Sequence, residues 1–335
     1  MNPNERIRSL IHSNQGIPLD QFMSLCISYY YNTRDPFGKK GDFITAPEIS
    51  QMFGEIIGIW CVNAWINLGK PKFNLVEIGG GRGTLMDDLL RGTKHIGEFG
   101  EDIQKIYMVE TSESLKSIQR QKLSRHNYNF IWLKDIENLE PCYNIIINNE
   151  FFDALPIKQF IKVRHGFREI YVTLKENEFI LMPLGAEIQL DIECKAEDII
   201  EVSPVRESYA NKITTCLKDY GGAALIIDYG YLNPPFISTL QAMKDNAYLD
   251  IFHNIGNSDL TSHVDFSSLI NIFKREELQC LFSTQGEFLR KCGIEFRAEQ
   301  LIKNGADKKK IQSELGRLVD KEQMGELFKV LELYS

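Results

Sequence analysis

Apolar and polar positions along much of this chain follow the rhythm of strands that alternate with helices. Residues 73 to 78 form an apolar run that predicts a buried strand, and residues 84 to 91 have the apolar spacing of a helix packed against it. The alternation continues to Asn149, which is typical of a parallel sheet. The pattern therefore predicts an α/β fold with a Rossmann-like sheet.

The pattern changes on both sides of this region. Helices are predicted over residues 3–12 and 18–31, and a further helix with a 3.6-residue apolar period follows Pro47. After Pro156, three short alternating stretches predict antiparallel strands that form an insertion or extend the sheet. These stretches are residues 158–163, 167–172 and 178–181. The parallel rhythm then resumes with a helix over 205–219 and a strand over 223–228.

These changes divide the chain into four segments. At 335 residues, the length favours about two domains. The expected segments are an N-terminal helical segment (1–66), a Rossmann-like domain (67–230, with the antiparallel extension at about 157–183), an accessory module (231–295) and a C-terminal segment (296–335). The accessory module is expected to cover the C-terminal edge of the sheet, and the last segment to complete the fold.

A glycine-rich loop follows the first predicted strand and indicates a cofactor site. Gly79, Gly80, Gly81 and Gly83 occupy four of five positions, and Glu77 stands just before them. A dinucleotide fingerprint needs its third glycine where this chain has Thr84. A carboxylate so close would repel a diphosphate but would attract an ammonium or sulfonium group. S-adenosylmethionine carries both cations, so the pattern favours it as the cofactor.

Two further acids stand where the next strands are expected to end. Glu110 is placed to accept hydrogen bonds from ribose hydroxyls, and Asp135 from the adenine amino group. Open α/β sheets bind their ligands at this edge, outside the carboxyl ends of the strands. The alternative is that either acid simply caps a helix.

The chemistry is expected at the end of the strand over residues 143–147. Asn149 and Glu150 emerge there beside the cofactor, Phe151 offers an aromatic face to a sulfonium, and Asp153 follows. The alternative for Asp153 is that it caps a helix beginning at Ala154.

Several ordered motifs resemble one known family, over roughly residue 20 to the C-terminus. They are residues 41–54 (GDFITAPEISQMFG), the glycine loop, residues 149–156 (NEFFDALP), residues 221–230 (GGAALIIDYG), residues 258–266 (SDLTSHVDF) and residues 324–328 (MGELF). Together they resemble the methyltransferase family that includes the mitochondrial complex I assembly-factor protein arginine methyltransferase and its bacterial relatives. The chain departs from the family at Gly80, where proline is usual, and at Asn246, where histidine is usual.

The resemblance implies a class I methyltransferase with a seven-stranded sheet. Such an enzyme would transfer a methyl group from S-adenosylmethionine to an arginine of a protein. The resemblance implies that this arginine lies on a subunit of respiratory complex I. It also implies that Gly41 and Asp42 close over the cofactor or the substrate. A guanidinium arrives protonated, so a carboxylate must grip it and help the proton leave. We expect Glu150 to grip it and Asp153 to be the second carboxylate or the proton acceptor.

Besides Phe151, three residues are expected on the substrate side of the site. Asp228 and Tyr229 end a predicted strand near the acceptor, although they alternatively only make a tight turn. His263 with Asp265 could form a proton relay, since histidine titrates near neutral pH. Capping or buried hydrogen bonding is the favoured alternative for this pair.

The amino-acid composition excludes several classes of function. A net charge of −8 argues against nucleic-acid binding and mildly favours a basic protein partner. Seven cysteines without a Cys-x-x-Cys pair argue against disulfides and structural zinc, and methyl transfer needs no metal. With no secretory signal and no apolar run long enough for a membrane span, the bacterial cytoplasm is the expected location.

Other functions stay open at this point. A noncatalytic assembly factor could keep the cofactor fold, and a methyltransferase could act on another protein or on a small molecule. An NAD-dependent oxidoreductase is the third possibility.

Overall fold

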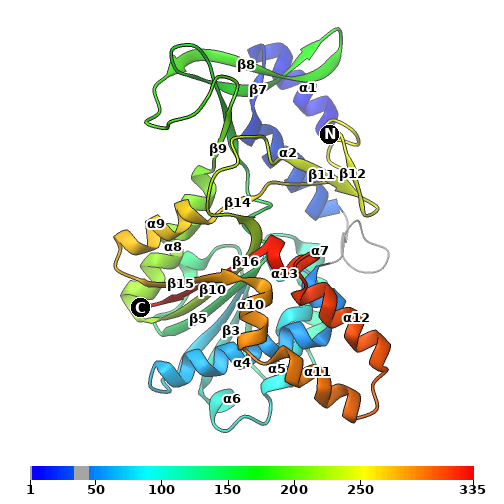
Figure 1. Ribbon diagram of the computed structural model, residues 1–335, viewed down its shortest axis with the longest axis vertical. Helices are drawn as coiled ribbons and strands as arrows, with labels where there is room; N and C mark the ends of the chain where they lie inside the picture. Colours follow the sequence, from blue (N-terminus) through cyan, green and yellow to red (C-terminus); the bar gives the residue numbers. More distant parts are fainter. Residues whose placement is uncertain (1, 34–44) are drawn as a thin grey trace.

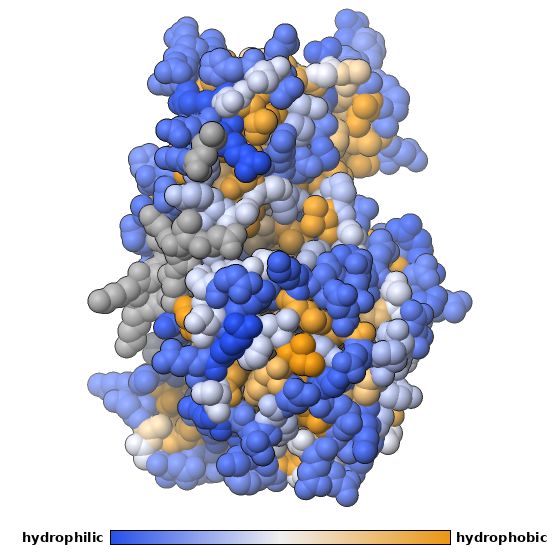
Figure 2. Space-filling model, turned by 180° about the vertical axis from the view of Figure 1, so that it is seen from behind, coloured by the Kyte–Doolittle hydropathy of each residue, from blue (hydrophilic) through white to orange (hydrophobic). Residues whose placement is uncertain are grey.

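The computed structural model describes residues 2–33 and 45–335 of the chain. Two parts lie one above the other in Figure 1. We call the lower part the body; it comprises residues 45–149, 203–231 and 264–335. We call the upper part the upper lobe; it comprises residues 2–33, 157–202 and 236–262. Seen from behind, the molecule narrows between them, and hydrophobic residues are visible in the narrowing (Figure 2).

The body is built around one sheet whose strands lie in the order β15-β16-β10-β5-β2-β3-β4. The strands are β2 (Phe73–Ile78), β3 (Ile103–Val109), β4 (Phe130–Leu133), β5 (Tyr143–Asn149), β10 (Gly222–Tyr231), β15 (Gln279–Thr284) and β16 (Phe328–Tyr334). Strands β2 to β5 and β10 run parallel, whereas β16 is antiparallel to both of its neighbours. A short strand, β14 (Val264–Asp265), extends the sheet beside the end of β10. The seven-stranded, Rossmann-like α/β fold is thus confirmed.

Both faces of the sheet are buried, which explains the continuous apolar runs in the sequence. Leu75, Ile145 and Leu225 point to one face, where α4 (Gln51–Asn67) and α5 (Thr84–Thr93) cover them. Their chain neighbours point to the opposite face, because side chains alternate along a strand. That face is covered by α8 (Pro204–Tyr220) and α9 (Phe266–Arg275). The carboxyl ends of the parallel strands meet at the edge below the upper lobe.

Helices account for most of the rest of the body, and the first two helices of the chain belong to the upper lobe. The α-helices are α1 (Pro3–Asn14), α2 (Leu19–Thr33), α3 (Ala46–Ile49), α4 (Gln51–Asn67), α5 (Thr84–Thr93), α6 (Phe99–Asp102), α7 (Glu113–Leu123), α8 (Pro204–Tyr220), α9 (Phe266–Arg275), α10 (Gln285–Lys291), α11 (Ile294–Lys303), α12 (Lys308–Val319) and α13 (Met324–Leu327). A short 3-10 helix, η1 (Ile136–Asn138), follows β4. None of the helices in the described ranges combines the length and apolarity that a bilayer crossing requires.

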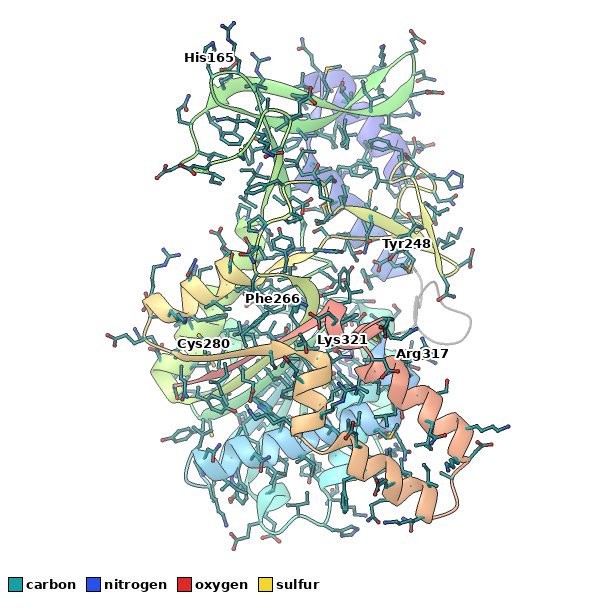
Figure 3. The ribbon with its side chains drawn as sticks, viewed as in Figure 1. His165, Tyr248, Phe266, Cys280, Arg317 and Lys321 are labelled. Carbon is teal, nitrogen blue, oxygen red and sulfur yellow. The ribbon has the colours of Figure 1, made fainter. Side chains whose placement is uncertain are left out.

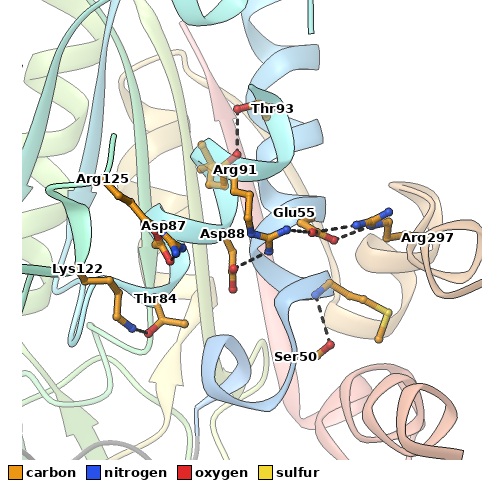
Figure 4. A network of polar contacts seen from close by, with 12 residues as sticks. Ser50, Glu55, Thr84, Asp87, Asp88, Arg91, Thr93, Lys122, Arg125 and Arg297 are labelled. Carbon is orange, nitrogen blue, oxygen red and sulfur yellow. Dashed lines mark hydrogen bonds and ion pairs between the residues drawn. The ribbon is translucent and has the colours of Figure 1, made fainter. Parts of the chain in front are cut away.

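A buried ionic cluster joins three of these helices on the outer side of the body. Glu55 on α4 accepts hydrogen bonds from both Arg91 on α5 and Arg297 on α11 (Figure 4). Arg91 also contacts Asp88 one turn earlier on its own helix. Because Glu55 is only 4% exposed, removal of its arginine partners would leave a buried charge without compensation, so the cluster ties α11 to α4 and α5.

The upper lobe combines three segments that are distant in the sequence. Its larger sheet has the order β1-β7-β6-β9, with β8 paired to β7, and its smaller sheet has the order β12-β11-β13. The strands are β1 (Ile17–Pro18), β6 (Lys158–Lys162), β7 (Phe167–Lys175), β8 (Glu178–Ile188), β9 (Ile199–Val202), β11 (Gln241–Lys244), β12 (Ala247–Leu249) and β13 (Asp259–Thr261). Phe22 on α2, Val172 on β7 and Leu260 on β13 share one apolar core, which holds the three segments together.

This arrangement differs from the segment boundaries expected from the sequence. The antiparallel strands after Pro156 form a sheet of their own with β1 and β9, and so they do not extend the body sheet. The expected accessory module 231–295 is divided between the two parts. Its β11–β13 region lies in the upper lobe, whereas α9 packs on α8 and β15 pairs with β16 in the body. Long-range pairing decides this division, and local patterning does not reveal it.

Candidate active site

A cavity of about 340 Å³ lies at the carboxyl edge of the body sheet, below the upper lobe. Its walls come from the glycine loop, the end of β5, α3, β11 to β13 and α13. Tyr248 on β12 and Arg317 on α12 line it from the upper lobe and the body respectively (Figure 3). Both side chains are exposed to solvent, so they mark where the cavity opens. Ligands of open α/β sheets bind at this edge.

The glycine loop makes a sharp turn between β2 and α5. Gly79, Gly81 and Gly83 all have positive φ angles, of 69°, 50° and 75°. Only glycine adopts this region without strain. A Cβ atom on Gly79 would also lie 2.9 Å from the ring of Phe151. The loop therefore depends on glycine both for its turn and for its packing against the predicted substrate-side residue Phe151.

Glu77 is the penultimate residue of the buried strand β2 and lines the cavity. Among the described residues, its Oε2 atom has no hydrogen-bond partner although the residue is only 2% exposed. Burial raises the pKa of Glu77 to about 8, and Lys122 offsets part of this effect. A Cβ atom on Gly80 would lie 2.8 Å from the Glu77 carboxyl carbon. The loop thus leaves room for a buried carboxylate that lacks a cation.

The two further predicted cofactor acids lie outside the lining of this cavity. Glu110 follows β3 and accepts a hydrogen bond from the backbone N–H of Ser112 at 2.8 Å. Asp135 caps η1 through Oδ1, and its Oδ2 accepts a 2.5 Å bond from Nζ of Lys212. The capping alternative therefore applies to Asp135. The contacts of these acids with ribose and adenine stay predictions.

Glu150 is held in an unusual backbone conformation directly after β5. Its φ angle is 52°, and its N–H donates to the carbonyl of Ile227 at 2.9 Å. Its Oε1 accepts hydrogen bonds from Nδ2 of Asn149 at 3.0 Å and from the N–H of Ala46 at 3.4 Å. Strain of this kind persists only where the surroundings impose it. Burial, and then the charge of Asp153, raise the pKa of Glu150 to about 8.

Asp153 lies in a turn that spans Phe152 to Leu155, closed by a 3.1 Å backbone hydrogen bond. No helix begins at Ala154, so the expected alternative of a helix cap is wrong. The N–H of Asp153 donates to Oδ2 of Asp228 at 3.1 Å, and burial raises the pKa of Asp153 to about 6. Burial and Asp153 together hold the pKa of Asp228 well above its usual range.

Arg206 holds this acidic turn in place, although it belongs to none of the motifs that predict the site. Its guanidinium donates to the carbonyl oxygens of Phe152, Asp153, Ser262 and His263 at 2.7 to 3.1 Å, and to the Ser262 hydroxyl at 2.7 Å. It joins the segment after β5 to the segment before β14. An arginine in the first turn of a helix, here α8, opposes the helix dipole, and this was the available signal.

The predicted substrate-side residues Tyr229 and His263 both line the cavity. Their rings meet edge to face with centroids 5.3 Å apart, and burial lowers the pKa of His263. Asp265 is the N-cap of α9, where its Oδ1 accepts bonds from the N–H groups of Ser267 and Ser268. The favoured capping alternative is therefore confirmed for Asp265. Gly41 and Asp42 lie outside the described residues.

Comparisons with known proteins identify the family. A family model of S-adenosyl-L-methionine-dependent methyltransferases matches residues 56–284, more than half of the chain. The chain belongs to this methyltransferase family. The protein arginine methyltransferase NDUFAF7 of Xenopus tropicalis mitochondria is 34% identical over 90% of this chain and 77% of that protein. The human protein of the same name is 31% identical over 89% of this chain and 75% of its own length.

Solved structures agree with the fold of this methyltransferase. A methyltransferase-like protein from Burkholderia thailandensis, bound to S-adenosyl-homocysteine, superposes with a TM-score of 0.84. The two chains are 21% identical, and the superposition covers 99% of this chain and 92% of that one. At this identity the likeness shows the shared fold.

The residues of the cavity fit S-adenosylmethionine, the cofactor of the family. Glu77 provides a buried carboxyl group whose Oε2 has no partner within the described part of the chain, and the glycine loop lets a ligand approach the backbone closely. Bound there, the cofactor supplies an electrophilic methyl group on a sulfonium. Glu150 and Asp153 line the same cavity, so an acceptor that contacts them lies close to the cofactor site.

Proposed function

We propose that this methyltransferase modifies an arginine side chain of a protein. The observation that carries the proposal is the pair of carboxyl groups of Glu150, which is half-buried, and Asp153, which is buried, in the cavity that also contains the glycine loop. Burial raises the pKa of both carboxyl groups, and the negative charge of Asp153 raises the pKa of Glu150 further. A bound cation would relieve both effects. The relatives named protein arginine methyltransferases support a guanidinium as that cation.

The chemistry of a guanidinium explains why two carboxyl groups are useful. Its pKa is above about 12, so it enters the site protonated and without a free lone pair. A carboxylate of Glu150 can bind it through paired hydrogen bonds and draw its positive charge away from the attacking nitrogen. That nitrogen gains the methyl group and releases one proton, which Asp153 or Glu150 can accept. The strained backbone of Glu150 fixes the position of its carboxyl group for this task.

The natural acceptor that we propose is an arginine on a subunit of respiratory complex I, in the bacterial cytoplasm. The family resemblance of the sequence motifs supports this choice. Peptide mass mapping of fractionated cells, with and without the gene, tests it. Loss of one or two methyl groups from an arginine of a complex I subunit is expected. Methylation of those subunits that does not depend on the gene would refute it.

Transfer of a radiolabelled methyl group to proteins of a gene-deleted lysate tests the proposed reaction. The wild-type enzyme should label arginine residues, and Glu150→Gln should reduce the rate by about 100-fold or more because one charged partner of the acceptor is lost. Titration calorimetry should show unchanged cofactor affinity in this variant. Glu137→Gln is the matched control, since Glu137 has an exposed side chain on η1 outside the cavity. Absence of arginine labelling, or full activity of Glu150→Gln, would overturn the proposal.

A further inference from the structure

A third carboxyl group enters the acceptor region from the upper lobe. Asp259 begins β13, is only 5% exposed, and lines the same cavity as Glu150 and Asp153. It is distant from both in the sequence, and the small sheet of the upper lobe brings it there. The acceptor region is therefore built from both parts of the molecule.

A phenol group orients this carboxylate. The hydroxyl of Tyr31, on α2, donates a hydrogen bond to Oδ1 of Asp259 at 3.1 Å. Burial and the charges of Asp259 and Asp153 raise the pKa of Tyr31 well above its usual value, so its hydroxyl stays protonated and acts as a donor. Tyr31 also lines the cavity. The Asp259 carboxylate is thus held at the wall of the site by a residue of the N-terminal helices.

An independent observation indicates that this region receives a ligand. Oδ1 of Asp153 is buried and, among the described residues, has no partner within hydrogen-bond geometry, although the nearby Tyr229 hydroxyl offsets part of the rise that burial causes in the pKa of Asp153. A buried polar atom without a partner is costly, so it is usually satisfied by a bound group. Asp153 lines the cavity, and Asp153 and Asp259 both raise the pKa of Glu150 through their negative charges. The missing partner is therefore expected to be a donor that carries positive charge.

The number of donors on a guanidinium matches this set of acceptors. A guanidinium has five N–H donors in a rigid plane, and two carboxylates can engage four of them. A third carboxylate gives a further acceptor for the remaining donor. A lysine ammonium presents only three donors from a single point and cannot contact acceptors that are spread around a plane. A neutral acceptor would leave the mutual repulsion of the carboxylates in place.

We propose, building on the proposed arginine methylation, that Asp259 binds the acceptor guanidinium together with Glu150 and Asp153. In this role Asp259 is a specificity-determining residue. It selects a planar cation over an ammonium or a neutral group, and it contributes to acceptor binding more than to the rate of transfer.

The variant Asp259→Asn tests the proposal, because asparagine still accepts the hydrogen bond from Tyr31 and loses only the charge. With the arginine peptide that the wild type methylates, KM should rise about 10- to 100-fold, since one charge-assisted hydrogen bond is weakened. The value of kcat should stay within about twofold, as expected when only binding is affected. Asp259→Glu, which keeps the charge, should have a KM closer to that of the wild type.

A binding measurement separates this proposal from the proposed function. N-acetyl-arginine methylamide and its lysine counterpart serve as probes in calorimetry with S-adenosylhomocysteine present, so that no turnover is needed. The wild type should prefer the arginine probe, and Asp259→Asn should lose most of this preference while it binds S-adenosylhomocysteine normally. Asp250→Asn is the matched control, because Asp250 is exposed beyond β12 and caps the following turn.

The outcomes are distinct. If the wild type methylates no arginine, the proposed function fails, and the probe measurement still decides whether Asp259 recognises a guanidinium. If the wild type methylates arginine and Asp259→Asn changes neither KM nor the preference between probes, only the role of Asp259 is overturned. An equal loss with Asp250→Asn would also overturn it, because the effect would then not belong to the cavity.

Discussion

Glu77 is expected to reduce the stability of the free enzyme while it strengthens cofactor binding. Burial raises the pKa of Glu77 from 4.5 to about 8. Because the pKa is higher in the folded state, the stabilising effect is fully present below about pH 4.5 and is lost as the pH rises through about 8. Glu77→Gln removes this ionisation with little change of shape.

The size of the effect follows from proton linkage. Between about pH 6 and pH 8 the unfolded chain has released the proton of Glu77 and the folded protein mostly retains it, so stability falls by nearly 1.4 kcal/mol per pH unit. The wild type should therefore lose about 2 kcal/mol more than Glu77→Gln over this interval. Because Glu77 is only 2% exposed, solvent screens this effect little.

Urea denaturation of both proteins without cofactor, at about pH 6 and pH 8, measures this difference. Other buried acids titrate equally in the two proteins and cancel from the comparison. Titration calorimetry of the same samples should show about 10- to 100-fold weaker binding of S-adenosylmethionine by Glu77→Gln. Parallel loss of stability in both proteins would refute the argument, since it would mean that folding does not raise the pKa of Glu77.

Other properties of the enzyme should follow from Glu150, Arg206 and Glu55. The value of kcat/KM for an arginine peptide should rise about tenfold between pH 7 and pH 9, because Glu150, with its pKa of about 8, binds the cation only when it is ionised. A flat pH profile in stopped-time assays would contradict this. Arg206→Met should lower the free energy of unfolding by about 3 kcal/mol, since it leaves four carbonyl oxygens without their donor. If urea denaturation shows a loss below about 1 kcal/mol, Arg206 does not hold the turn in place. Glu55→Gln should lower the free energy of unfolding by about 2 kcal/mol, measured in the same way, because it weakens the contacts of Arg91 and Arg297. A change in cofactor affinity would show that the cluster does more than hold the helices together.

The part of the site that could be predicted from the sequence lies on consecutive residues. A buried strand, a turn that needs positive φ angles and an amphipathic helix each leave a local pattern, and so Glu77 and the glycine loop were found. Asn149 and Glu150 were found because they directly follow an apolar strand, and parallel strands end at one edge. The structure brings these residues together in one cavity.

Contacts between distant segments could not be predicted from local sequence patterns. Arg206 contacts carbonyl oxygens, and any residue has a carbonyl, so its partners leave no compositional signal. Asp135 is paired with Lys212 on α8, a residue 77 positions away in the chain, and no local pattern indicates this contact. The pairing of Tyr31 with Asp259 depends on how α2 packs beside β13.

The sequence by itself determined the α/β fold of the body and the residues of the glycine turn, because hydrophobic periodicity and backbone preference act over a few neighbouring residues. Only the tertiary structure decided how the upper lobe is assembled and which acids face one another. Strand order, helix packing and the loss of water around a carboxyl group depend on residues that are far apart in the chain, so they emerge only when the whole chain has folded.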